Sequence, residues 1–136
     1  TNVTLGANAL TLNGSGNNTF GGAIGGTAGV TFAGTGTQTL TGANTYTGGT
    51  TIDAGSTLAL GAGGSLASGS AVNLAGAGAT FNLSGATGAQ TLGTLTGAAN
   101  TSVNLGANAL TLNGSGNGTF GGVIGGTGGL TLAGTG

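Results

Sequence analysis

Short stretches of alternating apolar and polar residues recur along the whole chain. In an extended strand, such alternation places valine, leucine and phenylalanine on one face and hydroxyl or amide side chains on the other. No stretch of about eleven residues has apolar positions at helical spacing without an intervening glycine. The pattern therefore predicts an all-β chain. We expect strands at Val3–Leu5, Leu10–Leu12, Val30–Phe32, Leu58–Leu60, Val72–Leu74, Phe81–Leu83, Val103–Leu105 and Leu110–Leu112.

The strands are short, and glycines lie between them. A typical sandwich uses strands of about 5–6 residues, so three- to five-residue strands favour a parallel β-solenoid, in which the chain turns a corner after each strand. Coils of roughly 20–30 residues would then stack about 4.8 Å apart, and five or six coils would form a rod of roughly 25–30 Å. We expect like apolar residues to stack in ladders, and a sandwich of hairpins is the alternative. Glycines with positive φ are expected to form turns at Asn13-Gly14, Gly21-Gly22, Gly25-Gly26, Gly48-Gly49 and Gly63-Gly64.

A long internal repeat organises the chain. Residues 1–36 return as residues 101–136 with seven substitutions, all among small or apolar and neutral polar residues. Self-similarity at a fixed spacing is typical of repeat architectures. We therefore interpret residues 1–136 as a single solenoid segment that holds one period of about 100 residues and the start of the next. Residue 1 is threonine and no signal peptide follows it, so we expect either a mature segment or a piece of a longer protein. The truncated repeat at residues 101–136 favours a piece of a longer protein.

The near absence of charge excludes several partners. The chain has no lysine, arginine or histidine, and its formal net charge is −1. Nucleic acids and anionic membrane surfaces are bound through basic residues, and no apolar run reaches the ~18–20 residues of a membrane helix. A net charge near zero provides little repulsion between chains. We therefore expect no nucleic-acid partner and no membrane insertion, but self-association, either end to end or between neighbouring repeats of one chain.

The residues that could carry chemistry are few. Asp53 is the only carboxylate, so paired acid–base chemistry cannot be built within one chain. Without histidine and cysteine we expect no catalytic residues, no cofactor and no metal site. Asp53 is expected to cap the turn Ile52–Gly55. The glycines of Gly21–Gly26 lack the lysine of a phosphate-binding loop and are expected to form corners. Asn-x-Ser/Thr triplets arise by chance in such a composition. Tyr46 and the phenylalanines are expected to pack rather than to bind sugars.

One stretch resembles a known family. Residues 28–61 contain Leu-Thr-Gly-Ala-Asn-Thr-Tyr-Thr-Gly-Gly-Thr-Thr-Ile at positions 40–52, then Ala54-Gly55 and Leu58-Ala59-Leu60-Gly61. This ordered set resembles the autotransporter-associated β-strand repeat of bacterial autotransporter passenger domains. The opening of the same motif returns at residues 129–136. The resemblance implies a right-handed parallel β-helix on the outer surface of a bacterium, or secreted from it.

Three functions agree with these observations. The first is a structural element, either a stalk or a self-associating fibre or surface-layer segment. The second is an adhesin scaffold whose outward asparagine and threonine rows bind glycans or host and biofilm surfaces. The third is an ice-binding solenoid, suggested by Thr-x-Thr triplets that begin at Thr35, Thr37 and Thr45. That third function needs the triplet on one face of every coil, and residues 56–86 lack it.

Overall fold

The computed structural model describes residues 1–136, which form strands, turns and bends but no helix. After each short strand the chain turns a corner, so no strand is longer than four residues. The strands are β1 (Val3–Thr4), β2 (Leu10–Leu12), β3 (Asn18–Phe20), β4 (Ile24–Gly25), β5 (Val30–Phe32), β6 (Thr37–Leu40), β7 (Thr50–Ile52), β8 (Thr57–Leu60), β9 (Ala71–Leu74), β10 (Thr80–Asn82), β11 (Gln90–Leu92), β12 (Thr94–Gly97), β13 (Ser102–Asn104), β14 (Leu110–Leu112), β15 (Val123–Gly125) and β16 (Leu130–Leu132).

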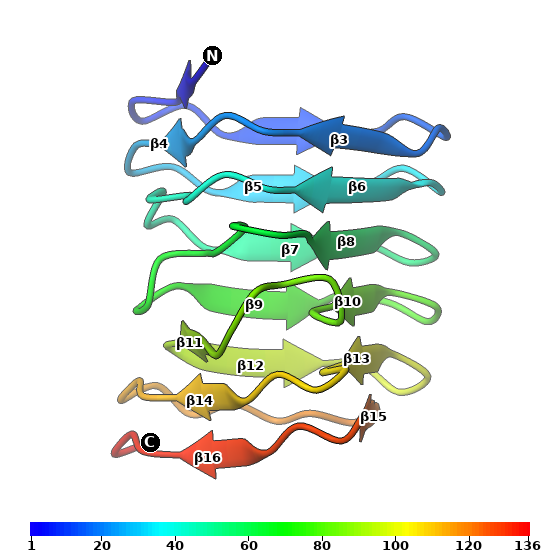
Figure 1. The fold of residues 1–136 in the computed structure, drawn as a ribbon, viewed down its shortest axis with the longest axis vertical. Helices are drawn as coiled ribbons and strands as arrows, with labels where there is room; N and C mark the ends of the chain where they lie inside the picture. The colour runs from blue at the N-terminus through cyan, green and yellow to red at the C-terminus, as the bar shows by residue number, and fades with distance from the viewer.

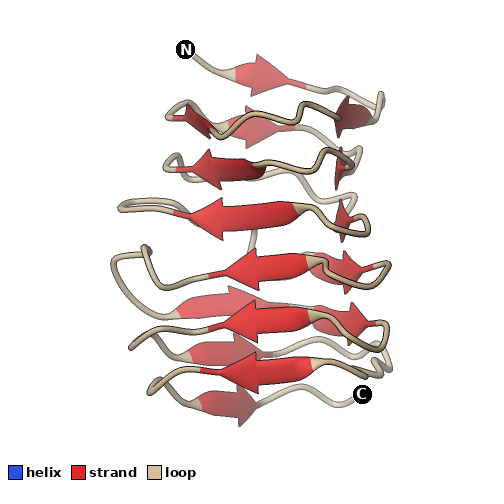
Figure 2. Ribbon diagram, turned by 90° about the vertical axis from the view of Figure 1, so that its right-hand side faces the viewer, coloured by secondary structure: helices blue, strands red, loops and turns tan.

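The strands stack into three faces that run the length of a rod (Figures 1 and 2). The first face holds β1, β4, β11, β14 and β16, with an isolated bridge between Ala43 and Ser65 in its middle. The second face holds β2, β5, β7, β9 and β12, and Phe120 bridges to Gly97 at its end. The third face holds β3, β6, β8, β10, β13 and β15. The chain thus makes six coils and one further strand, β16.

All paired strands are parallel, which confirms the solenoid and rules out the hairpin sandwich. As the chain descends from the N-terminus in Figure 1, it runs to the right on the far side and to the left on the near side. The solenoid is therefore right-handed, as the family resemblance implied.

Coil length varies along the rod, and the middle coils are longer than the first ones. On the second face the register partners Leu10, Val30, Thr50, Val72 and Leu95 follow one another at spacings of 20, 20, 22 and 23 residues. The next coil on this face spans 23 residues, from Gly97 to Phe120. These lengths lie at the short end of the predicted range.

The core is a narrow column of apolar side chains along the axis. A single cluster of 21 buried residues extends from Leu5 to Leu110. Alternation works as predicted: in β8, for example, Leu58 and Leu60 are buried while Thr57 and Ala59 are half-buried. Like residues stack in places, as in the first-face ladder of Leu92, Leu112 and Leu132. Elsewhere the ladders are mixed, because β-bridging fixes the register of the backbone and not the identity of the side chain.

The sequence pattern missed several strands. The residues of β6, β7, β11 and β12 are rich in threonine and glutamine, and β3, β4 and β15 are short and flanked by glycine. Each of these segments becomes a strand because the adjacent coil presents an edge of free N–H and C=O groups to it. Apolar alternation alone is therefore a sufficient signal for a strand in this fold, but not a necessary one.

Most of these glycines are needed because the backbones of neighbouring coils approach closely, and fewer are needed because their φ is positive. Gly26, Gly49 and Gly63 have positive φ, as predicted, but Gly14, Gly21 and Gly22 do not. At the corners, glycines of successive coils stack directly on one another. A Cβ added to Gly34 would overlap the carbonyl of Gly14 in the preceding coil. Glycine is needed there because any side chain would separate the coils.

The two copies of the repeat lie on different faces. In residues 1–36, β1, β2 and β3 lie on the first, second and third faces. Their equivalents in residues 101–136 are β13, β14 and Phe120, which lie on the third, first and second faces. Five successive coil spacings on the second face, 20, 20, 22, 23 and 23 residues, total 108, eight more than the 100-residue period. The second copy therefore begins about one face before the position that would complete five full coils after the start of the first copy.

Candidate functional site

The stretch that resembles the autotransporter repeat contains the most distinctive polar interior of the molecule. Between β6 and β7 it crosses the first face without forming a strand. Asn44 is 2% exposed there, and its side chain makes hydrogen bonds between coils that the backbone of a β-strand would otherwise make. Its Oδ1 accepts from Ile24 N–H at 3.0 Å, while its Nδ2 donates to Gly42 O at 2.9 Å and Ser65 O at 3.0 Å. Asn44 therefore connects its own coil to the coils on both sides.

Tyr46 fills the core two residues later. Its side chain is 1% exposed, and its hydroxyl lies 2.7 Å from Thr50 Oγ1. Thr50 occupies an inward position of β7, between Val30 and Val72, and is 2% exposed. The bond satisfies two hydroxyls that would otherwise be buried without partners. Burial raises the pKa of Tyr46 to about 12, although the hydrogen bond with Thr50 opposes this shift.

The predicted turn at Asp53 is present, but its carboxylate does not cap it. The turn is closed by the backbone carbonyl of Asp53, which accepts from Ser56 N–H at 3.0 Å, and Gly55 supplies the positive φ. The Asp53 side chain makes no hydrogen bond in the structure. A residue with φ near +73° after a small residue is sufficient for this turn.

No cluster of three or more histidine, cysteine, aspartate or glutamate residues is present. The chain also has no helix of the length and apolarity that membrane crossing requires. Tyr46, Phe32 and Phe81 are each 1% exposed or less, so these aromatic side chains pack in the core. Phe20 and Phe120 are partly buried near the two ends of the rod.

The side faces of the rod carry rows of neutral polar groups. On the second face the outward residues Thr11, Thr31, Thr51, Asn73 and Thr96 form one continuous column. Thr96 Oγ1 donates to Asn73 Oδ1 at 2.9 Å. These rows offer hydroxyl and amide groups at the spacing of β-strands, about 4.8 Å.

The third face does not repeat the Thr-x-Thr triplet. Its outward pair is Thr37 and Thr39 in β6, but the pair is Thr57 and Ala59 in β8. The following coils continue the two columns with Thr80 and Asn82, and then with Ser102 and Asn104. The triplet therefore occurs in one coil of this face only.

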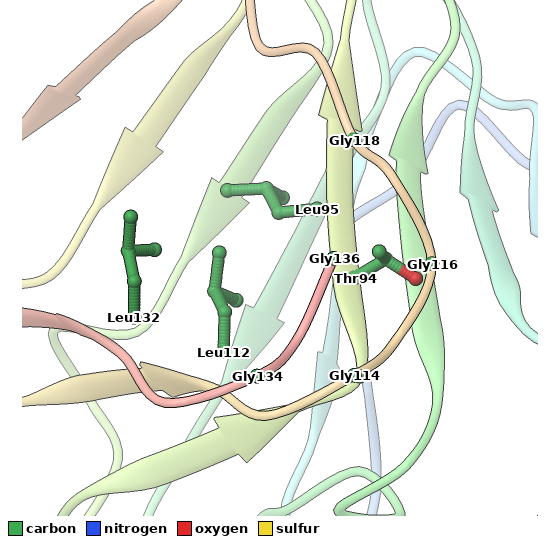
Figure 3. Close-up of a pocket in the computed structure, with 10 residues that line it drawn as sticks. Thr94, Leu95, Leu112, Gly114, Gly116, Gly118, Leu132, Gly134 and Gly136 are labelled. Atoms are coloured by element: carbon green, nitrogen blue, oxygen red, sulfur yellow. The ribbon is translucent and has the colours of Figure 1, made fainter.

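The two ends of the rod are its hollow, apolar surfaces. At the N-terminal end a hollow of about 230 Å³ is lined by side chains of the first two coils, among them Val3, Leu12 and Phe20. At the C-terminal end a hollow of about 160 Å³ lies between the leucine ladder and a column of corner glycines. Figure 3 shows Leu95, Leu112 and Leu132 pointing into this space.

Comparison with known proteins agrees with this architecture. The fold defines the chain as a right-handed parallel β-solenoid. Residues 30–60 match the family model described as Passenger-associated-transport-repeat. The chain is therefore a β-solenoid segment that carries an autotransporter passenger-associated repeat, which confirms the resemblance found in the sequence. Neither a curated protein nor a solved structure matches the chain.

The repeat family indicates where the protein is located. A passenger-associated repeat implies a bacterial protein that is secreted or exposed at the surface. The family is not one known for catalysis. The matched residues include Asn44, Tyr46 and Thr50, so the motif coincides with the polar interior described above. In this structure the motif supports the stacking of coils rather than a surface site.

Proposed function

We propose that this chain is a structural segment of an autotransporter-like surface protein, whose task is length and stiffness. One observation carries the proposal. Parallel ladders and a continuous core extend through six coils. The polar side chains of the family motif are buried inside that stack, and their hydrogen bonds are made there. In a rod built in this way, backbone hydrogen bonds connect each coil to the next along the whole length. The rod needs no ligand for its stability.

The rod also offers a basis for association with itself or with neighbouring repeats. Wherever a strand edge of such a rod is unpaired, it pairs readily with other strands. Its surface lacks the charges that keep such edges apart. The structural role and the association are compatible, because stacked coils extend the same rod.

An adhesin scaffold is the second candidate, and the outward column on the second face favours it. Thr11, Thr31, Thr51, Asn73 and Thr96 form a regular row of hydrogen-bonding groups that a neutral glycan could follow. No aromatic side chain accompanies this row, since the buried aromatics face the core. The row is therefore more polar than a typical carbohydrate platform.

Small-angle X-ray scattering and glycan-array binding on the 136-residue chain separate the two functions. The structural role predicts an elongated particle that binds no glycan saturably. Saturable binding that is lost when Thr31 and Thr51 are both replaced by alanine would instead establish the adhesin. The matched control is Thr57→Ala, which removes a hydroxyl from the third face. A compact scattering profile would contradict both.

A further inference from the structure

The corner that follows β14 places an asparagine–glycine pair, Asn113-Gly114, against two earlier coils of the stack. β14 lies on the first face, and Gly114 lies at the corner beyond it (Figure 3). In the preceding coil the same corner is formed by Gly93, which lies between β11 and β12. One coil earlier it is formed by Gly69, whose carbonyl a Cβ added to Gly93 would overlap. The pair therefore continues a column of corner backbone inside the rod.

The backbone of the pair is fixed by the preceding coil. Asn113 N–H donates to Leu92 O at 2.9 Å, and Gly114 N–H donates to Gly93 O at 2.8 Å. A Cβ added to Gly114 would overlap the carbonyl of Gly93, so the two backbones are in direct contact. The peptide between Asn113 and Gly114 therefore cannot rotate unless the two coils separate.

The side chain of Asn113 connects three successive coils. Its amide is oriented by its hydrogen-bonding neighbours, and Nδ2 then donates to Leu92 O and to Ser68 O, both at 3.0 Å. Leu92 belongs to the preceding coil and Ser68 to the coil before that one. Both partners are carbonyl oxygens, so only a side chain that donates twice can satisfy them. The residue itself is exposed, so water reaches this corner.

An asparagine followed by glycine can modify itself, because glycine has no side chain to hinder attack by its own backbone nitrogen. Gly114 N attacks Asn113 Cγ, the bond from Cγ to Nδ2 breaks, and ammonia leaves with the proton of Gly114 N. A five-membered succinimide ring remains. Water then opens the ring at either carbonyl, which leaves aspartate, or isoaspartate with the backbone routed through Cβ. Water is the only other reactant.

We propose that Asn113-Gly114 is a site of spontaneous modification that the stacked coils protect and that opening of this coil exposes. In the stack the attacking nitrogen is bonded to Gly93 O, and the leaving amide is bonded to Leu92 O and Ser68 O. When the coil separates from its neighbours, these bonds are released and the ring can close. This chemistry is the same whether the rod serves as a stalk or as an adhesin.

The product prevents the coil from closing again as before. A carboxylate at residue 113 has no N–H to donate, and it faces the carbonyl oxygens of Leu92 and Ser68, which repel it. Isoaspartate also lengthens the backbone at a corner where even a Cβ on Gly114 has no room. A transient opening is thereby converted into a lasting break in the stack.

Rates of modification in the folded and unfolded chain test the protection. The chain is incubated at mildly alkaline pH in buffer and in concentrated urea, and circular dichroism verifies its state in each. Since it has no lysine or arginine for trypsin, thermolysin peptides are sequenced by mass spectrometry. Sequencing separates Asn113 from Asn13 and Asn117, which also precede glycine. We expect Asn113 to be modified roughly tenfold or more slowly in buffer. Similar rates would show that the stack gives no protection and would overturn the proposal.

A second measurement links the modification to opening of the coil. Leu110→Ala removes a fully buried side chain from β14, whereas Thr111→Ala changes its outward neighbour. In buffer we expect Leu110→Ala to raise the rate at Asn113 about fivefold or more, up to the rate in urea, and Thr111→Ala to leave it within about twofold. An unchanged rate in Leu110→Ala, in a chain whose thermal melt shows lower stability, would contradict the link to opening.

The effect of the product is tested with Asn113→Asp. The matched control is Asn104→Asp, which places the same charge on an exposed position of β13. There the side chain only accepts, from Gly106 N–H at 3.0 Å, and a carboxylate accepts equally well. We expect exchange of the Gly114 amide hydrogen, corrected for its intrinsic rate, to become about tenfold faster in Asn113→Asp and to stay within about twofold in Asn104→Asp. Equal effects of the two variants would refute the proposed consequence of the modification.

Discussion

Residues 1–36 and 101–136 have nearly the same sequence but different positions in the molecule. The first copy is covered by a following coil and the second by a preceding one, so the exposed residues of one copy are buried in the other. Leu110 is fully buried while Leu10 is only partly buried, and Phe32 is fully buried while Leu132 is 75% exposed. The copies also occupy different faces. The local sequence thus determines where a strand forms and which of its sides faces inward. The neighbouring coils determine how deeply the strand is buried and on which face it lies.

The largest difference between the copies is expected at repeat position 32. Phe32→Ala should destabilise the chain by about 3–5 kcal/mol, because it removes a fully buried aromatic ring and leaves a cavity. Leu132→Ala should cost less than about 0.5 kcal/mol in the monomer, because the side chain is largely in solvent. Urea unfolding at low protein concentration compares the two. Equal losses would show that the last coil is covered in solution.

The second prediction concerns Tyr46, in the coil that follows the first copy. Above pH 10 the unfolded state releases the proton of Tyr46, whereas the folded state retains it until about pH 12. Stability contributed by the buried, neutral phenol is therefore complete below pH 10 and is lost as the pH rises toward 12. The loss should reach roughly 2–3 kcal/mol.

Tyr46→Phe provides the control. It leaves Thr50 Oγ1 buried without its partner, so it should cost about 1–3 kcal/mol at neutral pH. Since the chain has no lysine, arginine or cysteine, the variant should lose the alkaline decline between pH 10 and 12. Chemical unfolding at several pH values, with tyrosinate absorbance as a second readout, measures both effects. A decline that persists in Tyr46→Phe would contradict the assignment.

The third prediction uses one glycine of the repeat. A Cβ at Gly114 would overlap the carbonyl of Gly93 in the preceding coil, whereas a Cβ at Gly14 meets nothing within 4 Å. Gly114→Ala should therefore destabilise the chain by about 1–3 kcal/mol, since the backbone must move. Gly14→Ala should be neutral or slightly stabilising, because alanine restricts the unfolded chain. Thermal unfolding of both variants measures these effects. A larger loss of stability in Gly14→Ala than in Gly114→Ala would contradict the stacking.

The last prediction changes stability least and tests the difference in face directly. Thr111 pairs with Thr91 on the first face, so the double variant Thr91→Cys with Thr111→Cys should form an internal disulfide. If the second copy lay on the same face as the first, residue 111 would be next to Thr96 instead. The Thr96→Cys with Thr111→Cys variant is therefore expected to stay reduced. Mass spectrometry of peptides made without reducing agent distinguishes the two.

The polar interior between the copies was only partly predictable. The sequence identified the stretch around Asn44 and Tyr46 by its resemblance, and it correctly placed the aromatic ring in the packing. It gave no sign that Asn44 replaces a strand, because its partners Ile24 and Ser65 are twenty or more residues away along the chain. It also assigned the turn at residue 53 to the carboxylate, where the backbone carbonyl closes it. Side-chain bonding across coils depends on a register that local sequence does not contain.

By itself, the sequence determined the all-β class, the inward side of each alternating strand, the long repeat and the near absence of charge. These properties follow from periodicity and composition, which are local. Only the tertiary structure decided which face each copy occupies, which glycines must be bare, and which leucines remain exposed. The physical reason is that face and contact depend on the summed length of all intervening coils. A few additional residues in the middle coils are enough to move every later strand to another face.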